Sequence, residues 1–547
     1  MTDKELAELI FPNIKKTIAD YEKKYPKRAL TDNQYVTRFA PSPTGFVHIG
    51  NLIQALLDYF LAKSSDGVFY LRNEDTDTKR EVDSAVDKIM EVLDYADFKP
   101  DEYEYRGKII GNYGPYVQSE RKEIYHAFIK ELISMGRAYP CFCSAEELDI
   151  MRKKQEAKKC MPGYYGAWAK CRDLSNEERA ERIKNGESFV IRFKSMGNPN
   201  RRIKYDDLVM GIIEFPENNN DMVIMKSNDL LPTYHFAHVV DDHLMQTTHV
   251  VRGQEWLPSV PLHVEMFEAF GFTQPKYIHS CLLLKQEGNI RRKISKRKDP
   301  EALMTYYIEK GYPSEAVIES LMTILNSNYE EWRDNNPNAS YLEFPFDPKK
   351  IGTTGALYDL EKLDNISKNI ISKMNKDEVF DNLVKYTEEF DTDFDAILKK
   401  DVEYTKAILN IEREQAKPRK DFACWSNVKN SIWYMYEELY HPDNYEWMKI
   451  TDMDEIKSIC NTYFNDYYNE SDDKDTWFNK VKELSESLGY AGNMKEYKAN
   501  PDAYKGNVAD ISTVLRVSLT SKSQTPDLYE IMRILGKDEI MRRINNL

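Results

Sequence analysis

Residues 35–72 read YVTRFAPSPTGFVHIGNLIQALLDYFLAKSSDGVFYLR, and this stretch decides the fold. A β-prone run from Tyr35 to Ala40 ends in a proline-rich turn, an amphipathic stretch follows, and a second β-like run spans Val68 to Arg72. Consecutive strands joined by a helix pair in parallel, because the helix carries the chain back to the starting edge of the sheet. We therefore predict a doubly wound, Rossmann-type parallel sheet with helices on its faces.

Outside this unit the pattern changes twice. Residues 122–226 mix helical and β-like runs and contain four of the seven cysteines. The alternation of strand and helix then resumes, and it ends near the basic stretch RRKISKRK at 291–298. Beyond Asp299, Leu, Ile and Tyr recur at helical spacing. These changes predict a multidomain α/β plus α chain, in which an α+β insertion splits the sheet domain and the C-terminal half is mostly helical.

Composition limits the class of protein. The 547 residues, 41% hydrophobic and 31% charged, exceed what one hydrophobic core accommodates and predict several ordered domains. No apolar run approaches the roughly 20 residues that cross a bilayer, and residues 1–34 have the charge and apolar spacing of an amphipathic helix. Seven scattered cysteines do not form a secreted disulfide framework, so we expect a reducing, cytoplasmic location. With a net charge of -15, RNA binding requires local basic patches.

Two stretches carry chemistry. His48 and Gly50 lie at the strand-to-helix turn, where a helix N-terminus favours phosphate and a glycine leaves room for a nucleotide. Lys293 and Lys296 belong to a run with six basic residues among the eight from 291 to 298. Such a run suits a phosphoryl transition state, because that catalysis consists chiefly of positioning and charge neutralisation. Alone, the run fits a solvated charge cluster or a nucleic-acid patch better, but its place directly after the last predicted strand favours catalysis.

These stretches resemble the HIGH and KMSKS signatures of class I aminoacyl-tRNA synthetases, and the wider sequence resembles the glutamyl-tRNA synthetase family. The resemblance extends over nearly everything after residue 35, and specificity for glutamate rests mainly on the strings PSPTG and EDTD. Further matching stretches are RNEDTD (72–77), PYVQSER (115–121), PTYHFAHVVDDHL (232–244), VRGQEW (251–256), DLEKL (359–363), VLRVSLT (514–520) and LYEIMRILG (528–536).

The resemblance implies a function and a division of the chain. ATP would activate L-glutamate as glutamyl-adenylate with release of pyrophosphate, and the glutamyl group would then pass to the terminal adenosine of tRNA-Glu with release of AMP. The implied parts are an N-terminal helical extension (1–34), two halves of the catalytic domain (35–121 and 227–298), an acceptor-stem-binding insertion (122–226), a stem-contact helical domain (299–385) and a helical anticodon-binding domain (386–547).

Site residues also follow from the resemblance. Arginines suit a dicarboxylate because each guanidinium fork can meet a carboxylate bidentately. The implied glutamate-binding residues are Arg38, Ser42, Glu74, Tyr234, His238 and Arg252. The implied ATP-binding residues are His48, Gly50, Glu255, Trp256, Lys293 and Lys296, with His48 and Lys296 catalytic. Mg²⁺ would accompany ATP through phosphates and water, so no protein ligands are predicted for it.

The sequence departs from the family pattern at two of these motifs. Asn51 ends the first signature where the class name has His, a position at which glutamyl enzymes vary. His238 stands where the family commonly shows Asn, which puts its contact with the substrate in doubt.

Four cysteines of the insertion leave two interpretations open. Cys141, Cys143, Cys160 and Cys171 resemble the zinc knuckle of some family members, and four thiolates complete a tetrahedral site. The spacing is not that of a standard finger, and Tyr165 is an alternative to Cys160. The other interpretation is four reduced cysteines without a metal.

For tRNA, the family arrangement implies anticodon contacts in the helical C-terminal part. Arg413, Lys417 and Arg419 provide positive charge there, and the nearby Phe422 and Trp425 provide aromatic surfaces for unstacked bases. A helix end whose Trp packs inward is the alternative. The resemblance also implies a monomer, and it leaves open whether tRNA-Gln is charged as well.

The sequence also bears on four alternative functions. A glutaminyl enzyme of the same subclass stays open. A truncated paralogue that modifies a tRNA base lacks the helical C-terminal half, and a small-molecule nucleotidyltransferase would not need it. The intact HIGN and KISKRK stretches disfavour a tRNA-binding scaffold with a dead active site.

Overall fold

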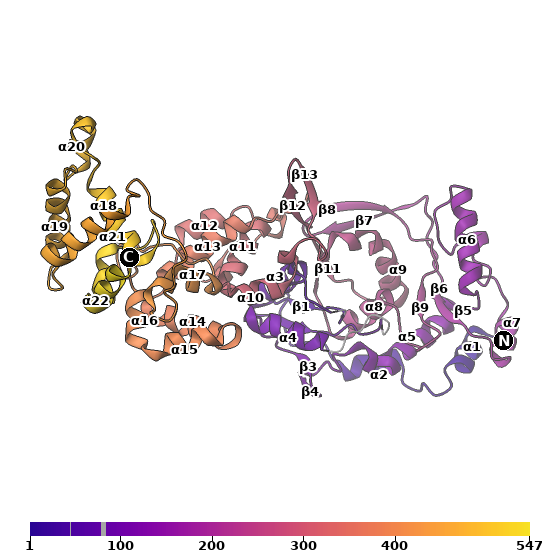
Figure 1. Cartoon of the computed structure of the whole chain (residues 1–547). Helices are drawn as coiled ribbons and strands as arrows, with labels where there is room; N and C mark the ends of the chain where they lie inside the picture. The colour runs from indigo at the N-terminus through magenta and orange to yellow at the C-terminus, as the bar shows by residue number, and fades with distance from the viewer. Residues whose placement is uncertain (44, 78–83) are drawn as a thin grey trace. The chain divides into compact units, whose positions relative to one another are not determined.

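The computed structural model describes residues 1–43, 45–77 and 84–547 (Figure 1). The chain forms two compact units. The first consists of Met1–Tyr307 and Ile318–Asp359, and the second of Ile308–Val317 and Leu360–Leu547.

The predicted strand–helix–strand unit opens the sheet of the first unit. Strand β1 (Val36–Phe39) and strand β2 (Val68–Leu71) pair in parallel, and helix α3 (Ile49–Ser64) connects them. All four residues of β1 are buried, as expected of a parallel strand covered on both faces. The parallel register, with Arg38 opposite Tyr70, brings the carboxyl ends of both strands to the same edge.

The second half of the sheet comes from residues some 200 positions later. Strand β10 (His249–Gly253) pairs in parallel with strand β11 (Lys276–Ser280), and helix α9 (Val260–Phe270) lies between them in sequence. The backbone N–H of Thr248 donates to the carbonyl of Val36 at 3.0 Å, so β10 lies beside β1. This arrangement confirms the predicted Rossmann-type core, split by an insertion.

The insertion is an α+β segment, as predicted. Its strands form a three-stranded antiparallel sheet and a separate hairpin. The sheet is β5 (Ala138–Cys141), β6 (Val190–Phe193) and β9 (Val223–Met225), and the hairpin is β7 (Arg202–Asp207) with β8 (Gly211–Pro216). The remaining helices that lie wholly in the first unit, apart from two near the N-terminus, are α4 (Ala85–Tyr95), α5 (Lys122–Ser134), α6 (Ala145–Ala157), α7 (Asn176–Lys184), α8 (Tyr234–Leu244) and α12 (Tyr329–Asn335).

The basic stretch begins within a strand, whereas the sequence placed it after the last predicted strand. Its first part is strand β13 (Ile290–Lys293), which forms an antiparallel hairpin with β12 (Leu283–Glu287). The sequence gives no strand signal here, because both faces of β13 are polar or exposed. Two short pairings complete the strands, between β3 (Tyr103–Tyr105) and β4 (Lys108–Ile110), and between β12 and β14 (Ala356–Leu357).

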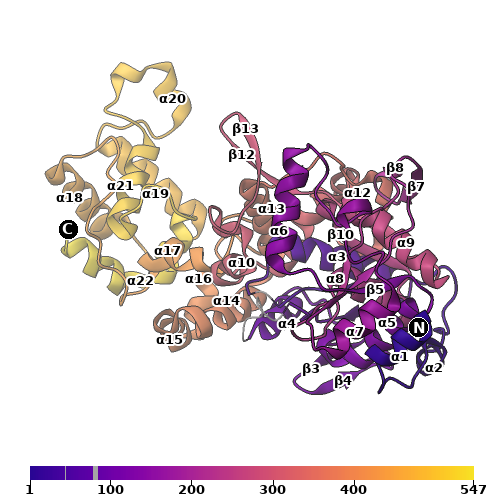
Figure 2. The same cartoon turned by 90° about the vertical axis from the view of Figure 1, so that its right-hand side faces the viewer.

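The N-terminal extension is two helices where one was predicted. Helix α1 (Asp3–Ile10) and helix α2 (Ile18–Lys24) each begin with a capping box, on Thr2 and Thr17. Leu6 is buried in the core beneath, and Leu9, Ile10 and Ile14 pack against it. Helix α1 lies beside α7 in both Figure 1 and Figure 2.

The second unit is helical, which confirms the prediction for the C-terminal half. A single core of Leu, Ile and aromatic side chains runs through it. Gly311 and Gly489 have φ of 70° and 83° and follow helices, where a glycine can end a helix in the left-handed conformation. The helices are α13 (Leu360–Lys373), α14 (Lys376–Phe390), α15 (Thr392–Lys400), α16 (Val402–Leu409), α17 (Val428–Ile432), α18 (Met453–Thr462), α19 (Lys474–Ser487), α20 (Met494–Ala499), α21 (Val508–Thr520) and α22 (Leu528–Asn545), while α10 (Met304–Lys310) and α11 (Ser314–Leu325) contribute residues to both units.

No helix among the described residues has the length and apolar character needed to cross a membrane. The seven cysteines are all free thiols.

Candidate active site

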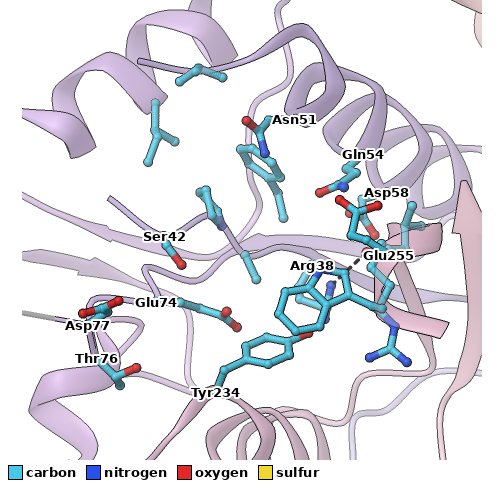
Figure 3. Close-up of a pocket in the computed structure, with 18 of the residues that line it drawn as sticks. Arg38, Ser42, Asn51, Gln54, Asp58, Glu74, Thr76, Asp77, Tyr234 and Glu255 are labelled. Atoms are coloured by element: carbon cyan, nitrogen blue, oxygen red, sulfur yellow. Dashed lines mark hydrogen bonds between the residues drawn. The ribbon is translucent and has the colours of Figure 1, made fainter. Parts of the chain in front are cut away.

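A cleft of about 590 Å³ opens at the carboxyl ends of β1, β2 and β10 (Figure 3). Ligands of doubly wound sheets bind at this edge, beyond the ends of the strands. Eight of the residues predicted from the sequence line the cleft: Arg38, Ser42, Glu74, Tyr234, Arg252, Glu255, Trp256 and Lys296. Of the PSPTG string, Thr44 lies outside the described residues.

Arg38 and Glu74 form one wall of the cleft, at the ends of neighbouring strands. Arg38 is only 3% exposed, and its Nη1 donates to the carbonyl of Val251 at 3.3 Å. Glu74 accepts from Nη2 of Arg72 at 2.9 Å. Burial raises the pKa of Glu74, although the positive charges of Arg72 and Arg38 oppose the shift. This wall therefore offers a cation and an acid in a site screened from water.

Two consecutive carboxylates on α8 hold this wall together. Asp242 accepts from Arg72 at 2.6 Å and lies 3.4 Å from Nε of Arg38. Burial alone would raise the pKa of Asp242, but Arg72 and Arg38 hold it well below its usual range. Asp241 accepts from Arg121 at 2.7 Å on the opposite side. The arginines of the wall are thus fixed by buried ion pairs.

Arg252 extends from the end of β10 on the other side of the cleft. Its Nε and Nη1 each meet a histidine ring nitrogen, at 2.9 and 3.0 Å. Its Nη2 is buried and has no hydrogen-bond partner in the part of the chain that the structure describes. Tyr234 and Trp256 stand beside it with ring centroids 4.4 Å apart. An unpaired donor on the wall of a cleft is available to a ligand oxygen.

His238, predicted to contact glutamate, lies away from the cleft. Its Nε2 lies 2.8 Å from the hydroxyl of Tyr277, and its Nδ1 lies 2.6 Å from Oδ2 of Asp242. The side chain is fully buried and is not on the cleft wall. His238 therefore lies behind the arginine wall and outside the lining of the cleft, and its contact with glutamate stays a prediction.

His48 caps helix α3 beside the cleft. The N–H of Gly50 donates to Nδ1 of His48 at 2.9 Å, and the N–H of His48 donates to Oδ1 of Asn51 at 3.1 Å. Asn51, the departure noted in the sequence, therefore completes a capping box. Burial, with the charges of Lys296 and Lys293, lowers the pKa of His48 to about 4. The imidazole is neutral at pH 7, with its proton on Nε2.

The KISKR segment meets the α3 turn, as the sequence predicts. Nζ of Lys296 donates to the carbonyl of Phe46 at 2.8 Å, across 250 residues of sequence. Arg292 anchors the segment through two bonds to the carboxylate of Asp299, at 2.7 and 2.8 Å. Lys293 is exposed on β13 and does not line the cleft. Two signature stretches far apart in sequence therefore border one cavity.

The cysteines of the insertion are gathered differently from the prediction. Sγ atoms of Cys141, Cys143 and Cys171 lie within 4.8 Å of one another. The hydroxyl of Tyr164 lies 3.4 Å from Sγ of Cys141 and 3.2 Å from Sγ of Cys143. Cys160 lies outside this cluster, and its Sγ donates a hydrogen bond to the carbonyl of Lys158. The predicted alternative Tyr165 also points elsewhere, to the carbonyl of Met161. Tyr164, one residue earlier, is the fourth oxygen or sulfur group of the cluster.

The predicted anticodon region is only partly accessible. Arg413 is 5% exposed and donates to the carbonyls of Leu409 and Ile371 at 2.8 and 2.6 Å. Phe422 and Trp425 are buried in the core of the second unit. Lys417 is exposed, and Arg419 is partly exposed beside Glu412. Trp425 thus packs inward, as in the alternative, and Arg413 and Phe422 are buried as well.

Several residues of the site were not singled out from the sequence, although Asp242 lies in the matching stretch 232–244. Asp58 lines the cleft from α3, and Asp242 holds its arginines. His263 on α9 and His279 on β11 contact Arg252. Each lies in an ordinary helix or strand pattern. The one feature that could have indicated a functional role is a polar residue at a position where the pattern predicts a buried face.

Models of known families match most of the chain. Residues 34–331 match the model for "tRNA synthetases class I (E and Q), catalytic domain". Residues 394–547 match the model for an anticodon binding domain.

Similar proteins agree over the full length. A glutamate–tRNA ligase of Clostridium perfringens is 48% identical over 100% of both chains. Another, of Sorangium cellulosum, is 39% identical over 96% of each. A crystal structure of a glutamate tRNA ligase from Elizabethkingia meningosepticum in complex with its amino acid superposes with a TM-score of 0.75, at 28% identity, covering 94% of this chain and 99% of that one.

Proposed function

The chain belongs to the class I tRNA synthetases of the glutamyl and glutaminyl type, and from this premise we propose that it joins L-glutamate to tRNA-Glu with consumption of ATP. The observation that carries the proposal is one cleft that combines Arg38, Arg252 and Glu74 with the α3 turn and Lys296. A dicarboxylic amino acid and a nucleotide triphosphate are the two ligands that this set of charges suits.

We propose that the arginine side of the cleft binds glutamate. Arg38 and Arg252 face its two carboxylates, and Glu74 accepts from its ammonium group. Ser42 and Tyr234 complete the pocket, since both line the cleft. Ion pairs formed in such a buried site are worth more than in water, so two cations select a dicarboxylate.

ATP is proposed to occupy the α3 side, accompanied by Mg²⁺. The neutral His48 donates Nε2–H to a phosphate oxygen, because its Nδ1 already accepts from Gly50. Gly50 is proposed to leave room near the helix start, and Glu255 and Trp256, which line the same cleft, are proposed to contact the nucleotide. Lys296 neutralises charge on the phosphates, and Lys293 adds positive potential from β13.

The reaction follows from these positions. An oxygen of the glutamate α-carboxylate attacks the α-phosphorus of ATP, and the bond to the departing pyrophosphate breaks. A ribose hydroxyl of the terminal adenosine of tRNA then attacks the carbonyl carbon of glutamyl-adenylate, and AMP leaves. Neither step needs a covalent bond to the protein.

We propose that tRNA contacts several parts of the chain. The insertion (122–226) binds the acceptor stem, residues 299–385 contact the stem, and residues 386–547 bind the anticodon, in line with the family model over residues 394–547. Within this last part, Lys417 and Arg419 are the proposed phosphate contacts, since Arg413 is buried. The chain is proposed to act as a monomer, as the family resemblance implies, and in the cytoplasm, in line with its seven cysteines that form no disulfide.

The experiment that tests the function is aminoacylation of purified tRNA-Glu and tRNA-Gln, each with glutamate and with glutamine. We expect glutamate to be attached to tRNA-Glu, with ATP consumed. Attachment of glutamine would make the chain a glutaminyl enzyme, and tRNA binding without any charging would make it a scaffold. Light scattering checks the monomer against the chain mass of 64.1 kDa.

We further propose a structural zinc ion in the insertion, held by Cys141, Cys143, Cys171 and Tyr164. Three thiolates and a phenolate complete a tetrahedral set, and the donor atoms already lie together. Elemental analysis should find zinc in the wild-type chain and in Cys160→Ser, but not in Cys143→Ser. Wild-type protein without zinc would favour the interpretation of four reduced cysteines.

A further inference from the structure

Arg252 is held by a row of buried side chains that do not themselves line the cleft. Its Nε donates to Nε2 of His279 at 2.9 Å, and its Nη1 donates to Nδ1 of His263 at 3.0 Å. The ring of Tyr277 lies against the guanidinium, 4.2 Å from Cζ to the ring centroid. The guanidinium is thus fixed within its plane by two histidines and across its plane by an aromatic face.

The chemistry of arginine fixes the protonation of both histidines. A guanidinium is always charged and has no acceptor, so each contacting ring nitrogen must be an unprotonated acceptor. His279 then carries its proton on Nδ1, which lies 2.6 Å from Oδ2 of Asp207. His263 carries its proton on Nε2, which lies 3.0 Å from Nδ1 of His235. All hydrogen bonds in the row have a determined direction.

Burial keeps the row in this state. His263 and His279 are 0% exposed, and burial lowers the pKa of both rings. Asp207, at the end of β7, is buried as well and accepts from the N–H groups of Val209 and Met210 at 3.0 and 2.8 Å. The fixed start of the row therefore lies in the hairpin of the insertion, outside the nucleotide-binding fold.

The row leaves one guanidinium nitrogen of Arg252 available to bind a ligand. With Nε and Nη1 committed, Nη2 is the nitrogen that is buried without a partner among the described residues. Rotation of the guanidinium would break a bond to one histidine or the other, and a buried donor without an acceptor is costly. Nη2 therefore stays fixed before any ligand arrives, on a residue that lines the cleft.

We propose that His279 and His263, with Asp207 behind His279, are positioning residues that orient Arg252 so that its Nη2 meets a carboxylate of the amino-acid substrate. The inference rests on the proposed function, because it assigns that carboxylate to glutamate. It predicts that the two histidines determine affinity for the amino acid and not for ATP, although neither touches the substrate.

The test is glutamate- and tRNA-dependent exchange of pyrophosphate into ATP, with KM measured separately for glutamate and for ATP. His279→Leu should raise the KM for glutamate about tenfold to hundredfold, the range for losing a hydrogen bond to a charged group. The KM for ATP should change less than twofold. His279→Gln should recover much of the loss, because its amide oxygen can accept from Nε while its NH₂ group faces Asp207.

Two controls separate positioning from general structure. His249→Gln alters a buried histidine of the same sheet that bonds to Thr248 and not to Arg252, and it should leave both KM values unchanged. In an Arg252→Lys background, His279→Gln and His279→Leu should have little further effect on the glutamate KM, because the group they orient is gone.

Equal shifts in both KM values, or an undiminished effect of His279→Leu in the Arg252→Lys background, would overturn the proposal. If His279→Leu does not fold, the comparison of His279→Gln with His249→Gln decides by the same criterion. Absence of glutamate-dependent exchange in the wild-type chain would instead refute the proposed function itself.

Discussion

The two ends of the cleft are built in opposite ways. At the amino-acid end, Arg38 and Arg252 are each 3% exposed, and Arg72 is fully buried. Most of their nitrogens are committed to carboxylates, carbonyls or imidazoles. At the proposed phosphate end, Lys296 is exposed after the β12–β13 hairpin, and Lys293 is exposed on β13 outside the lining of the cleft. One end is a fixed lattice of charges, and the other consists of lysines on flexible stems.

The difference matches what each ligand does. Glutamate keeps the charge of both carboxylates until it reacts, so cations already held in place can bind it without first having to be ordered. The phosphates of ATP change their charge and geometry as pyrophosphate leaves, so cations that follow the charge are more useful than fixed ones. We therefore expect changes at the phosphate end to affect turnover, and changes at the amino-acid end to affect affinity and stability.

The largest expected effect is at the phosphate end. Lys296→Ala should lower kcat for pyrophosphate exchange about 1,000-fold, or about 4 kcal/mol of activation free energy, because it removes charge stabilisation of the transition state. The KM for glutamate should change little. Lys298→Ala is the matched control, since Lys298 is exposed in the same stretch but does not line the cleft.

Steady-state exchange kinetics on both variants check the prediction. A loss in Lys298→Ala as large as in Lys296→Ala would mean that the basic stretch acts through its overall charge. A rise in the glutamate KM of Lys296→Ala would contradict the separation of the two ends.

The next effect is on stability at the amino-acid end. Asp242→Asn leaves Arg72 and Arg38 buried without their shared counter-charge. Breaking one partner of a buried ion pair should lower the free energy of unfolding by about 3 kcal/mol. Unfolding in urea, followed by circular dichroism, measures the change.

Glu214→Gln serves as the comparison for Asp242→Asn. It breaks the exposed ion pair with Lys204 in the same unit, in which the two side chains are 52% and 70% exposed. Surface pairs of this kind contribute little, so its unfolding midpoint should match that of the wild type. Equal midpoints for Asp242→Asn and the wild type would show that the arginine wall is not a fixed lattice.

Much of the fold could be predicted because local patterns agreed with it. The residues of β1 and α3 have the β-branched run, the turn and the helical apolar spacing that the structure uses. Strand β13 was missed because its residues, Ile-Arg-Arg-Lys, have no buried face. It is a strand because it pairs with β12, and this tertiary interaction leaves no alternating apolar pattern in the sequence.

The site was predictable only where a motif carried it. His48, Lys296 and the cleft arginines belong to recognisable strings, and the structure gathers them. Cys160 fits a spacing argument as well as Cys171 does, but the chain path brings Tyr164 to the thiols instead. Arg413 has the charge of an RNA contact, yet its guanidinium satisfies buried carbonyls. His263 and His279 gave no signal, because their role depends on a contact with Arg252 that only folding creates.

The smallest expected effect concerns Asp58. Among the α3 residues that line the cleft, Asp58 is the one with a carboxylate, and it lies on the arginine side. It is 1% exposed, and neither carboxylate oxygen has a partner with hydrogen-bond geometry among the described residues. Burial raises the pKa of Asp58 well above 3.8, although Arg38 opposes the shift. The folded chain therefore binds this proton more tightly than the unfolded chain does. Stability from Asp58 is present below about pH 4 and is lost as the pH rises toward the raised pKa.

Asp58→Asn removes the proton and the charge but keeps the shape of the side chain. Near pH 4 the variant and the wild type should unfold at the same urea concentration, because both side chains are neutral there. By pH 8 the variant should be more stable by about 1 kcal/mol, the lower end of the cost of burying an unpaired polar group, since Arg38 compensates part of it. Asp32→Asn, at an exposed residue of the same unit, should show no such pH-dependent difference. A variant less stable than the wild type at pH 8 would mean that Asp58 is a charged counterpart of Arg38, and the arginine end of the cleft would then hold a third fixed ion pair.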